Sequence, residues 1–134
     1  MLKFLIIDDD ELGRELIALH LEGIAECDTA ENGFLGVQKF RDSFERGVPY
    51  DVILLDIVMP EMDGHTAAME IRQIEKDWGV TISDGVTIIV LSSLHTPSDV
   101  IQTYVAARSA AHLVKPVMPE KLLKTLTKLN ILTP

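Results

Sequence analysis

The fold of this chain is decided by the stretch Tyr50-Asp51-Val52-Ile53-Leu54-Leu55-Asp56-Ile57-Val58-Met59-Pro60-Glu61-Met62-Asp63-Gly64. Its apolar run ends at an ionisable side chain, Asp56, shortly before a turn rich in proline and glycine. Such a run is typical of a strand that is buried on both faces of a parallel sheet. Because parallel sheets bind ligands at the carboxyl ends of their strands, Asp56 is the first candidate functional residue.

The length and composition of the chain bound its class. Its 134 residues suit one domain, and 47% hydrophobic with 25% charged residues is ordinary for a globular protein. No apolar run is long enough to span a membrane and no signal peptide precedes the first strand, so we expect a cytoplasmic protein without a membrane partner. The net charge of -9 argues against a nucleic-acid partner. Cys27 is the single cysteine, so no disulfide can form within the chain.

Apolar runs and amphipathic patterns alternate along the whole chain. Besides the run that ends at Asp56, such runs predict strands at 2–7, 25–30, 86–91 and 112–114. Five alternations of strand and helix imply an α/β fold with a doubly wound parallel sheet, right-handed crossovers and helices on both faces.

Five segments show helical periodicity. The first helix carries Leu12, Leu16 and Leu19, which are spaced four and three residues apart. The second helix carries Phe34, Val37, Phe40 and Phe44, the inner face of the third is predicted to be Ala67, Ile71, Ile74 and Trp78, and that of the last is Leu122, Leu126 and Leu129. Pro97 opens the fourth helix, which we expect to run to about Ala107.

Polar residues follow four of the predicted strands at the edge where ligands bind. Asp8 and Asp9 follow the first strand, Asp56 ends the third, Ser92 follows the fourth and Lys115 follows the fifth. Three gathered carboxylates repel one another unless a cation lies among them, and Mg²⁺ prefers such oxygen ligands. With Asp56 as nucleophile and with Ser92 and Lys115 as partners for phosphoryl oxygens, the set suits phosphoryl transfer to Asp56.

Some polar residues of the same segments have simpler interpretations. Acidic residues before a helix often cap it, and Asp10 is interpreted as a cap or as a solvated residue. The pair Asp63-Gly64 is a turn and cap signal, and Asp63 is given no chemistry. Ser93 competes with Ser92 for the hydroxyl role, and the alternation of the strand favours Ser92.

The chain resembles the receiver domain of two-component response regulators over residues 1–129. The resemblance is carried by residues 55–64 together with Asp8-Asp9, Ser92 and Val114-Lys115-Pro116. It implies a flavodoxin-like fold whose five parallel strands have the order 2-1-3-4-5, with five helices.

The resemblance also implies a role for each site residue. Asp56 becomes the phosphoacceptor, and Asp8 and Asp9 become Mg²⁺ ligands together with Asp56 and the backbone carbonyl of Val58. Ser92 becomes the switch hydroxyl and Lys115 the cation that senses the phosphoryl group. The Lys115-Pro116 peptide bond is expected to be cis.

The chain departs from the family pattern around the expected switch. His112 stands where the family usually has an aromatic switch residue, Arg108 replaces a usual glycine and Val117 a common phenylalanine. Val58 and Leu94 are apolar at positions that tune the phosphoryl lifetime. We hypothesise that His112 couples protonation to switching near neutral pH, since a histidine has a reference pKa of about 6.5.

As a function, the resemblance implies a stand-alone response regulator, with a receiver domain at 1–129, a short tail at 130–134 and no output domain. It would accept a phosphoryl group from a sensor histidine kinase or a histidine phosphotransfer protein. It would not be an enzyme beyond its own phosphorylation and dephosphorylation. A downstream protein would dock on the last two helices and the last strand, where Ile101, Tyr104, Val105 and Val117 supply apolar surface, and a homodimer would use the same face.

Two other functions stay open. A haloacid-dehalogenase-type phosphatase would use Asp8 as its nucleophile, with Ser92 and Lys115 as later motifs. Its final acidic motif is missing, because Glu120 is the only acid after Lys115. A receiver-like interaction module that takes no phosphate would have no need of the intact set of carboxylates, hydroxyl and lysine.

Overall fold

One parallel sheet organises the molecule. A computed structural model describes residues 1–57, 59, 62–92 and 108–133. The five strands are β1 (Leu2–Ile7), β2 (Ala25–Ala30), β3 (Val52–Asp56), β4 (Thr87–Ser92) and β5 (Ala111–Val114), and their order in the sheet is β2-β1-β3-β4-β5. The predicted flavodoxin-like topology is therefore confirmed.

Four α-helices belong to the described residues: α1 (Glu11–His20), α2 (Gly33–Glu45), α3 (Gly64–Asp77) and α5 (Pro119–Lys128). A short 3-10 helix, η1 (Ile82–Asp84), lies between α3 and β4. The fourth predicted helix, at 97–107, lies outside the described residues. None of the helices in the described ranges is long and apolar enough to cross a bilayer.

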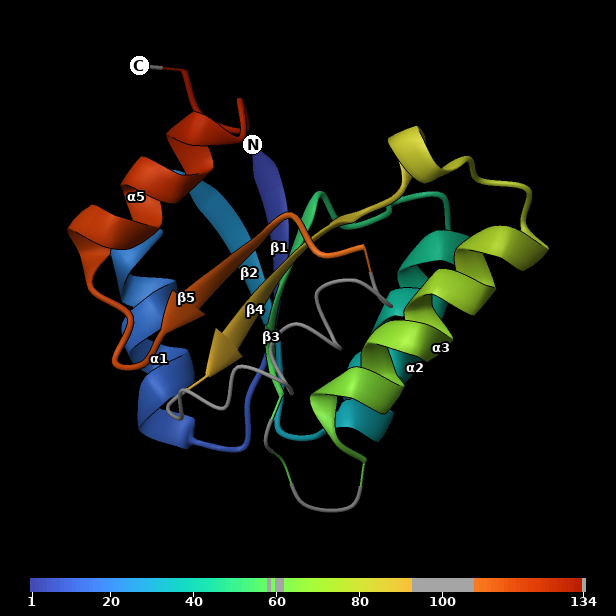
Figure 1. Ribbon diagram of the computed structural model, residues 1–134, viewed down its shortest axis with the longest axis horizontal. Coiled ribbons are helices and arrows are strands. Elements are labelled where there is room, and N and C mark those ends of the chain that lie inside the picture. The colour runs from blue at the N-terminus through green and yellow to red at the C-terminus, as the bar shows by residue number, and fades with distance from the viewer. Residues whose placement is uncertain (58, 60–61, 93–107, 134) are drawn as a thin grey trace.

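Helices cover both faces of the sheet (Figure 1). α1 and α5 lie on one face, and α2 and α3 lie side by side on the other. Successive side chains of a strand point to opposite faces, so Leu5 and Leu55 pack with the residues of α2 and α3, whereas Phe4 and Leu54 pack with those of α1 and α5. β3 is buried along its whole length, as its apolar sequence predicts.

The faces of two helices differ from the simplest reading of their periodicity. Leu12, Leu16 and Leu19 indicated α1 by their spacing, but they are 63%, 42% and 61% exposed, whereas Ile17 is 2% exposed. Trp78, predicted on the inner face of α3, is 55% exposed and packs edge-on against Phe44, with ring centroids 5.4 Å apart. The prediction for Trp78 was wrong because this residue is the C-cap of α3, where the helix ends.

Candidate functional site

Three carboxylates meet at the carboxyl edge of the sheet. β1 and β3 are adjacent and parallel, with Ile7 opposite Leu55, so the next residues, Asp8 and Asp56, come out side by side. One carboxylate oxygen from each of Asp8, Asp9 and Asp56 lies within 4.8 Å of the other two. Asp8 and Asp56 are buried, and Asp9 is exposed. The strands thus gather the three acids that the sequence placed at this edge.

Lys115 supplies the positive charge at this cluster. Its Nζ lies 2.8 Å from Asp8 Oδ2 and 3.2 Å from Asp56 Oδ2. Burial lowers the pKa of Lys115, but the hydrogen bonds to Asp8 and Asp56 and the negative charges of these two carboxylates outweigh burial, so the pKa is raised. The lysine therefore stays charged at neutral pH and offsets part of the repulsion among the acids.

The turn between β1 and α1 is held by hydrogen bonds of the Asp8 backbone and side chain. The Asp8 N–H donates to the carbonyl of Ala30 over 3.1 Å, and Asp8 Oδ1 accepts from the N–H of Asp10 over 3.0 Å. Arg14 Nη1 donates to the Asp8 carbonyl over 2.7 Å. Asp10 occupies the N-cap position of α1, but its side chain makes no capping hydrogen bond. Sequence reasoning missed Arg14, because a single arginine in a first helix carries no signal for a turn contact.

β4 and β5 place the remaining predicted residues. Ser92 is the last residue of β4, is buried, and lies opposite Val114 in the register of the sheet. The N–H of Lys115 donates to the Ser92 carbonyl over 2.9 Å, and the Lys115-Pro116 peptide bond is cis. His112 lies opposite Val90, further from the carboxyl edge, and is partly exposed. Val58, Ser93 and Leu94 lie outside the described residues.

The beginning of α3 lies close to the end of β3. The N–H of Gly64, the first residue of α3, donates to the Ile57 carbonyl over 3.2 Å. A Cβ added at Gly64 would lie 2.5 Å from the Cα of Ile57, so only glycine fits this approach. Asp63 caps α3 by accepting a hydrogen bond from the N–H of Thr66 at Oδ1, over 2.8 Å. Asp63 and Gly64 therefore have a structural role at the start of α3, as the turn and cap signal predicted.

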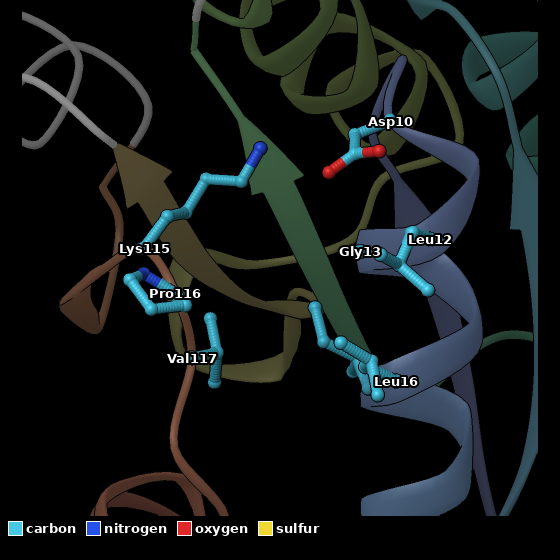
Figure 2. Close-up of a pocket in the computed structure, with 8 residues that line it drawn as sticks. Asp10, Leu12, Gly13, Leu16, Lys115, Pro116 and Val117 are labelled. Atoms are coloured by element: carbon cyan, nitrogen blue, oxygen red, sulfur yellow. The ribbon is translucent and has the colours of Figure 1, made fainter.

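An apolar groove of about 470 Å³ opens beside the carboxylates. Figure 2 shows Leu12 and Leu16 of α1 facing Pro116 and Val117, with Lys115 near one end of the groove. Two of the exposed leucines of α1, Leu12 and Leu16, thus belong to one wall of the groove. Sequence reasoning did not find this groove, since its two walls are about a hundred residues apart along the chain.

Comparisons with known sequences agree with this architecture. A family model described as "Response regulator receiver domain" matches residues 4–127. "Two-component response regulator ORR41" of Oryza sativa subsp. japonica is 35% identical over 134 residues, covering 98% of this chain and 96% of that protein. "Chemotaxis protein CheY" of Bacillus subtilis is 32% identical over 128 residues, covering 94% and 95%. "Histidine protein kinase 1" of Candida albicans is 27% identical, and this chain spans only 5% of its length.

Solved structures show the same fold. Chemotaxis protein CheY4 of Vibrio cholerae superposes with a TM-score of 0.77 at 28% identity, covering 96% of this chain and 98% of that one. The receiver domain of the histidine kinase CKI1 from Arabidopsis thaliana, complexed with Mg²⁺ and BeF₃⁻, gives a TM-score of 0.76 at 26% identity, covering 93% and 89%. Both proteins thus share the arrangement of strands that gathers the carboxylates.

Proposed function

Because this chain belongs to the family of response regulator receiver domains, we propose that it is a signalling switch that accepts a phosphoryl group on Asp56. The proposed donor is a sensor histidine kinase or a histidine phosphotransfer protein. One observation carries the proposal: Asp8, Asp9 and Asp56 converge at the carboxyl edge of the sheet, with the ammonium group of Lys115 against two of them. A carboxylate in these surroundings suits the role of nucleophile.

In the proposed reaction, an oxygen of the Asp56 carboxylate bonds to phosphorus while the bond from phosphorus to the donor imidazole nitrogen breaks. The electron pair of the broken bond stays on that nitrogen, and the product is an aspartyl phosphate. Lys115 Nζ, 3.2 Å from Asp56 Oδ2, is close enough to bind an oxygen of the arriving phosphoryl group. The hydroxyl of Ser92, at the end of the neighbouring strand, is the proposed second partner.

The donor set fits Mg²⁺. Oxygens from three carboxylates lie within 4.8 Å of one another, and Mg²⁺ favours one or two carboxylates together with waters and phosphate oxygens. Asp8, Asp9 and Asp56 would hold the ion, and the carbonyl of Val58 stays a predicted ligand. When bound, Mg²⁺ supplies positive charge that stabilises the phosphoryl oxygens during transfer.

Two surfaces are proposed for protein partners. The apolar groove between α1 and residues 115–117 is lined by Lys115, whose ammonium group contacts the proposed nucleophile, and this favours a protein phosphodonor over a small molecule alone. The downstream partner is proposed to dock on β5, α5 and the predicted helix before β5, and homodimer formation would use the same face. Of the apolar residues predicted there, Val117 is partly exposed, and Ile101, Tyr104 and Val105 lie outside the described residues.

The proposal is tested by chemical phosphorylation. The protein is incubated with a small acyl phosphate, with and without Mg²⁺, and the position of the added group is found by mass spectrometry of its peptides. We expect one base-labile phosphoryl group on Asp56, formed only with Mg²⁺. Asp56→Asn should abolish it because the amide is not a nucleophile. Asp10→Asn, next to the cluster but outside it, is the control and should still be phosphorylated. Modification of Asp8 would instead support a phosphatase, and no modification would support an interaction module.

A further inference from the structure

A buried ion pair on α3 lies apart from the phosphoacceptor and is not explained by its chemistry. Arg72 Nη1 is 2.7 Å from Glu75 Oε1, and the two side chains are only 9% and 4% exposed. Buried ion pairs add little net stability, because the loss of hydration offsets their attraction. Their best-attested use is to fix one arrangement of the chain, so the backbone groups that this pair binds indicate its role.

The pair holds the backbone that leads into two strands. Glu75 Oε2 accepts from the N–H of Val86 over 2.6 Å, and Arg72 Nη1 donates to the Val86 carbonyl over 2.9 Å. Arg72 Nη2 donates to the carbonyl of Arg108 over 3.2 Å. Val86 directly precedes β4, and Arg108 comes shortly before β5. One guanidinium group on α3 therefore links the beginnings of two neighbouring strands.

Arg108 has an unfavourable backbone conformation. Its φ is +52°, in the left-handed region that side chains with a Cβ seldom adopt. The direction of its carbonyl depends on this conformation, and that carbonyl is the group that Arg72 binds. The hydrogen bond from Arg72 thus favours a turn that the Arg108 residue by itself disfavours.

β5 depends on the turn at Arg108 for its position, because its own contacts fix it less firmly than those of the other strands do. It has four residues, lies at an edge of the sheet and, within the described part of the chain, pairs with β4 alone (Figure 1). Of its residues only Leu113 is buried, so burial specifies its register weakly. A slip by one residue would turn Lys115 to the opposite face of the sheet, away from Asp8 and Asp56.

We propose that Arg72 is a positioning residue for Lys115: by holding the Arg108 carbonyl in its left-handed turn, Arg72 fixes the register of β5 and so the place of Lys115 at the carboxylates. The effect of Arg72 on the register of β5 does not depend on the proposed function. The consequence for phosphoryl transfer rests on the function proposed above.

Arg72→Lys is the primary test. Lysine keeps the positive charge beside Glu75 but lacks the planar fork that reaches both Val86 and Arg108. Hydrogen exchange is followed at the N–H of Ala110 and the N–H of Lys115, which donate to the carbonyls of Ile88 and Ser92. We expect their exchange to quicken by about tenfold or more relative to amides of β1 and β3. Tyr50→Phe is the control, since it removes a hydrogen bond to Asp28 on β2, at the opposite edge of the sheet, and should leave β5 unchanged.

A second substitution separates positioning from simple stabilisation. Glycine adopts left-handed φ without a steric penalty, so Arg108→Gly should favour the turn without help from Arg72. Adding Arg108→Gly to Arg72→Lys should therefore restore slow exchange in β5. If Arg72→Lys leaves the exchange of Ala110 and Lys115 at its original rate, or if Arg108→Gly gives no rescue, the proposal is wrong.

Phosphorylation by a small acyl phosphate at saturating Mg²⁺ is the functional measurement. Arg72→Lys should slow modification of Asp56, and the added Arg108→Gly should recover the rate. Loss of strand protection with an unchanged rate would overturn the positioning role. If the unmodified protein takes no phosphoryl group at all, the proposed function fails, while hydrogen exchange still decides whether Arg72 anchors β5.

Discussion

Tyr50 shows how one side chain can tie distant segments of the chain together. It lies just before β3 in the chain and is buried, and its hydroxyl donates to Asp28 Oδ2 on β2 over 2.6 Å. Burial raises the pKa of Tyr50, and so do the hydrogen bond to Asp28 and the negative charge of that carboxylate. The unfolded chain releases the phenolic proton near its reference pKa of about 10, whereas the folded protein retains it.

This difference makes stability depend on pH. The contribution of Tyr50 is fully present below a pH of about 10 and is lost as the pH rises through the native pKa. We expect the free energy of unfolding in urea to fall from about pH 9 to about pH 11. Tyr50→Phe should make that fall shallower without removing it, since the raised pKa values of Cys27 and Lys115 act in the same direction. Equal slopes in the two proteins would contradict the prediction.

The sequence of α1 predicts a helix but does not show which side of the helix is buried. Leu12, Leu16 and Leu19 outnumber Ile17 and make the helix evident from sequence, yet Ile17 packs with the core residues between α1, α5 and the sheet. The three leucines instead stay exposed, and two of them line the groove beside the phosphoacceptor site. Periodicity alone therefore located the helix but did not identify its buried face.

Two substitutions on α1 test this orientation. Ile17→Ala should lower the free energy of unfolding by about 2 to 5 kcal/mol, because it leaves a cavity in the core. Leu19→Ala removes a side chain of the same size from an exposed position and should change that free energy by no more than about 0.5 kcal/mol. Urea denaturation of both variants provides the measurement. Comparable losses would mean that α1 is rotated relative to the sheet.

The molecule as a whole carries a net charge of -9 and concentrates three carboxylates at one edge of its sheet. An ion that binds these carboxylates only in the folded state should stabilise the entire domain. Mg²⁺ at a hundred times its dissociation constant should add about 2.7 kcal/mol to the free energy of unfolding and raise the melting temperature.

Stabilisation by Mg²⁺ bound at the carboxylates can be distinguished from the general effect of salt on an acidic protein. Melting temperatures are compared in MgCl₂ and in NaCl of the same ionic strength, because salt alone also reduces repulsion in an acidic protein. Asp9→Asn should remove most of the gain specific to Mg²⁺, whereas Asp10→Asn should keep it because Asp10 is not part of the cluster. Equal gains in the two salts would argue against a metal site.

The sequence by itself determined the alternation of strands and helices, the strand ends that carry Asp8, Asp56 and Ser92, and the resemblance that the comparisons confirmed. These features depend on local periodicity and on the residue at the end of each run, and both are legible along the chain. The capping role of Asp63 was equally local.

Only the tertiary structure decided which groups meet. It placed Lys115 against Asp8 and Asp56, left the leucines of α1 exposed, and buried Glu75, although acidic side chains are mostly exposed in folded proteins. Arg72 and Glu75 are three residues apart and read as an ordinary surface pair; their burial depends on β4 and β5 lying against α3. Such contacts join residues that are far apart along the chain, so they arise from packing and from strand order rather than from any local pattern.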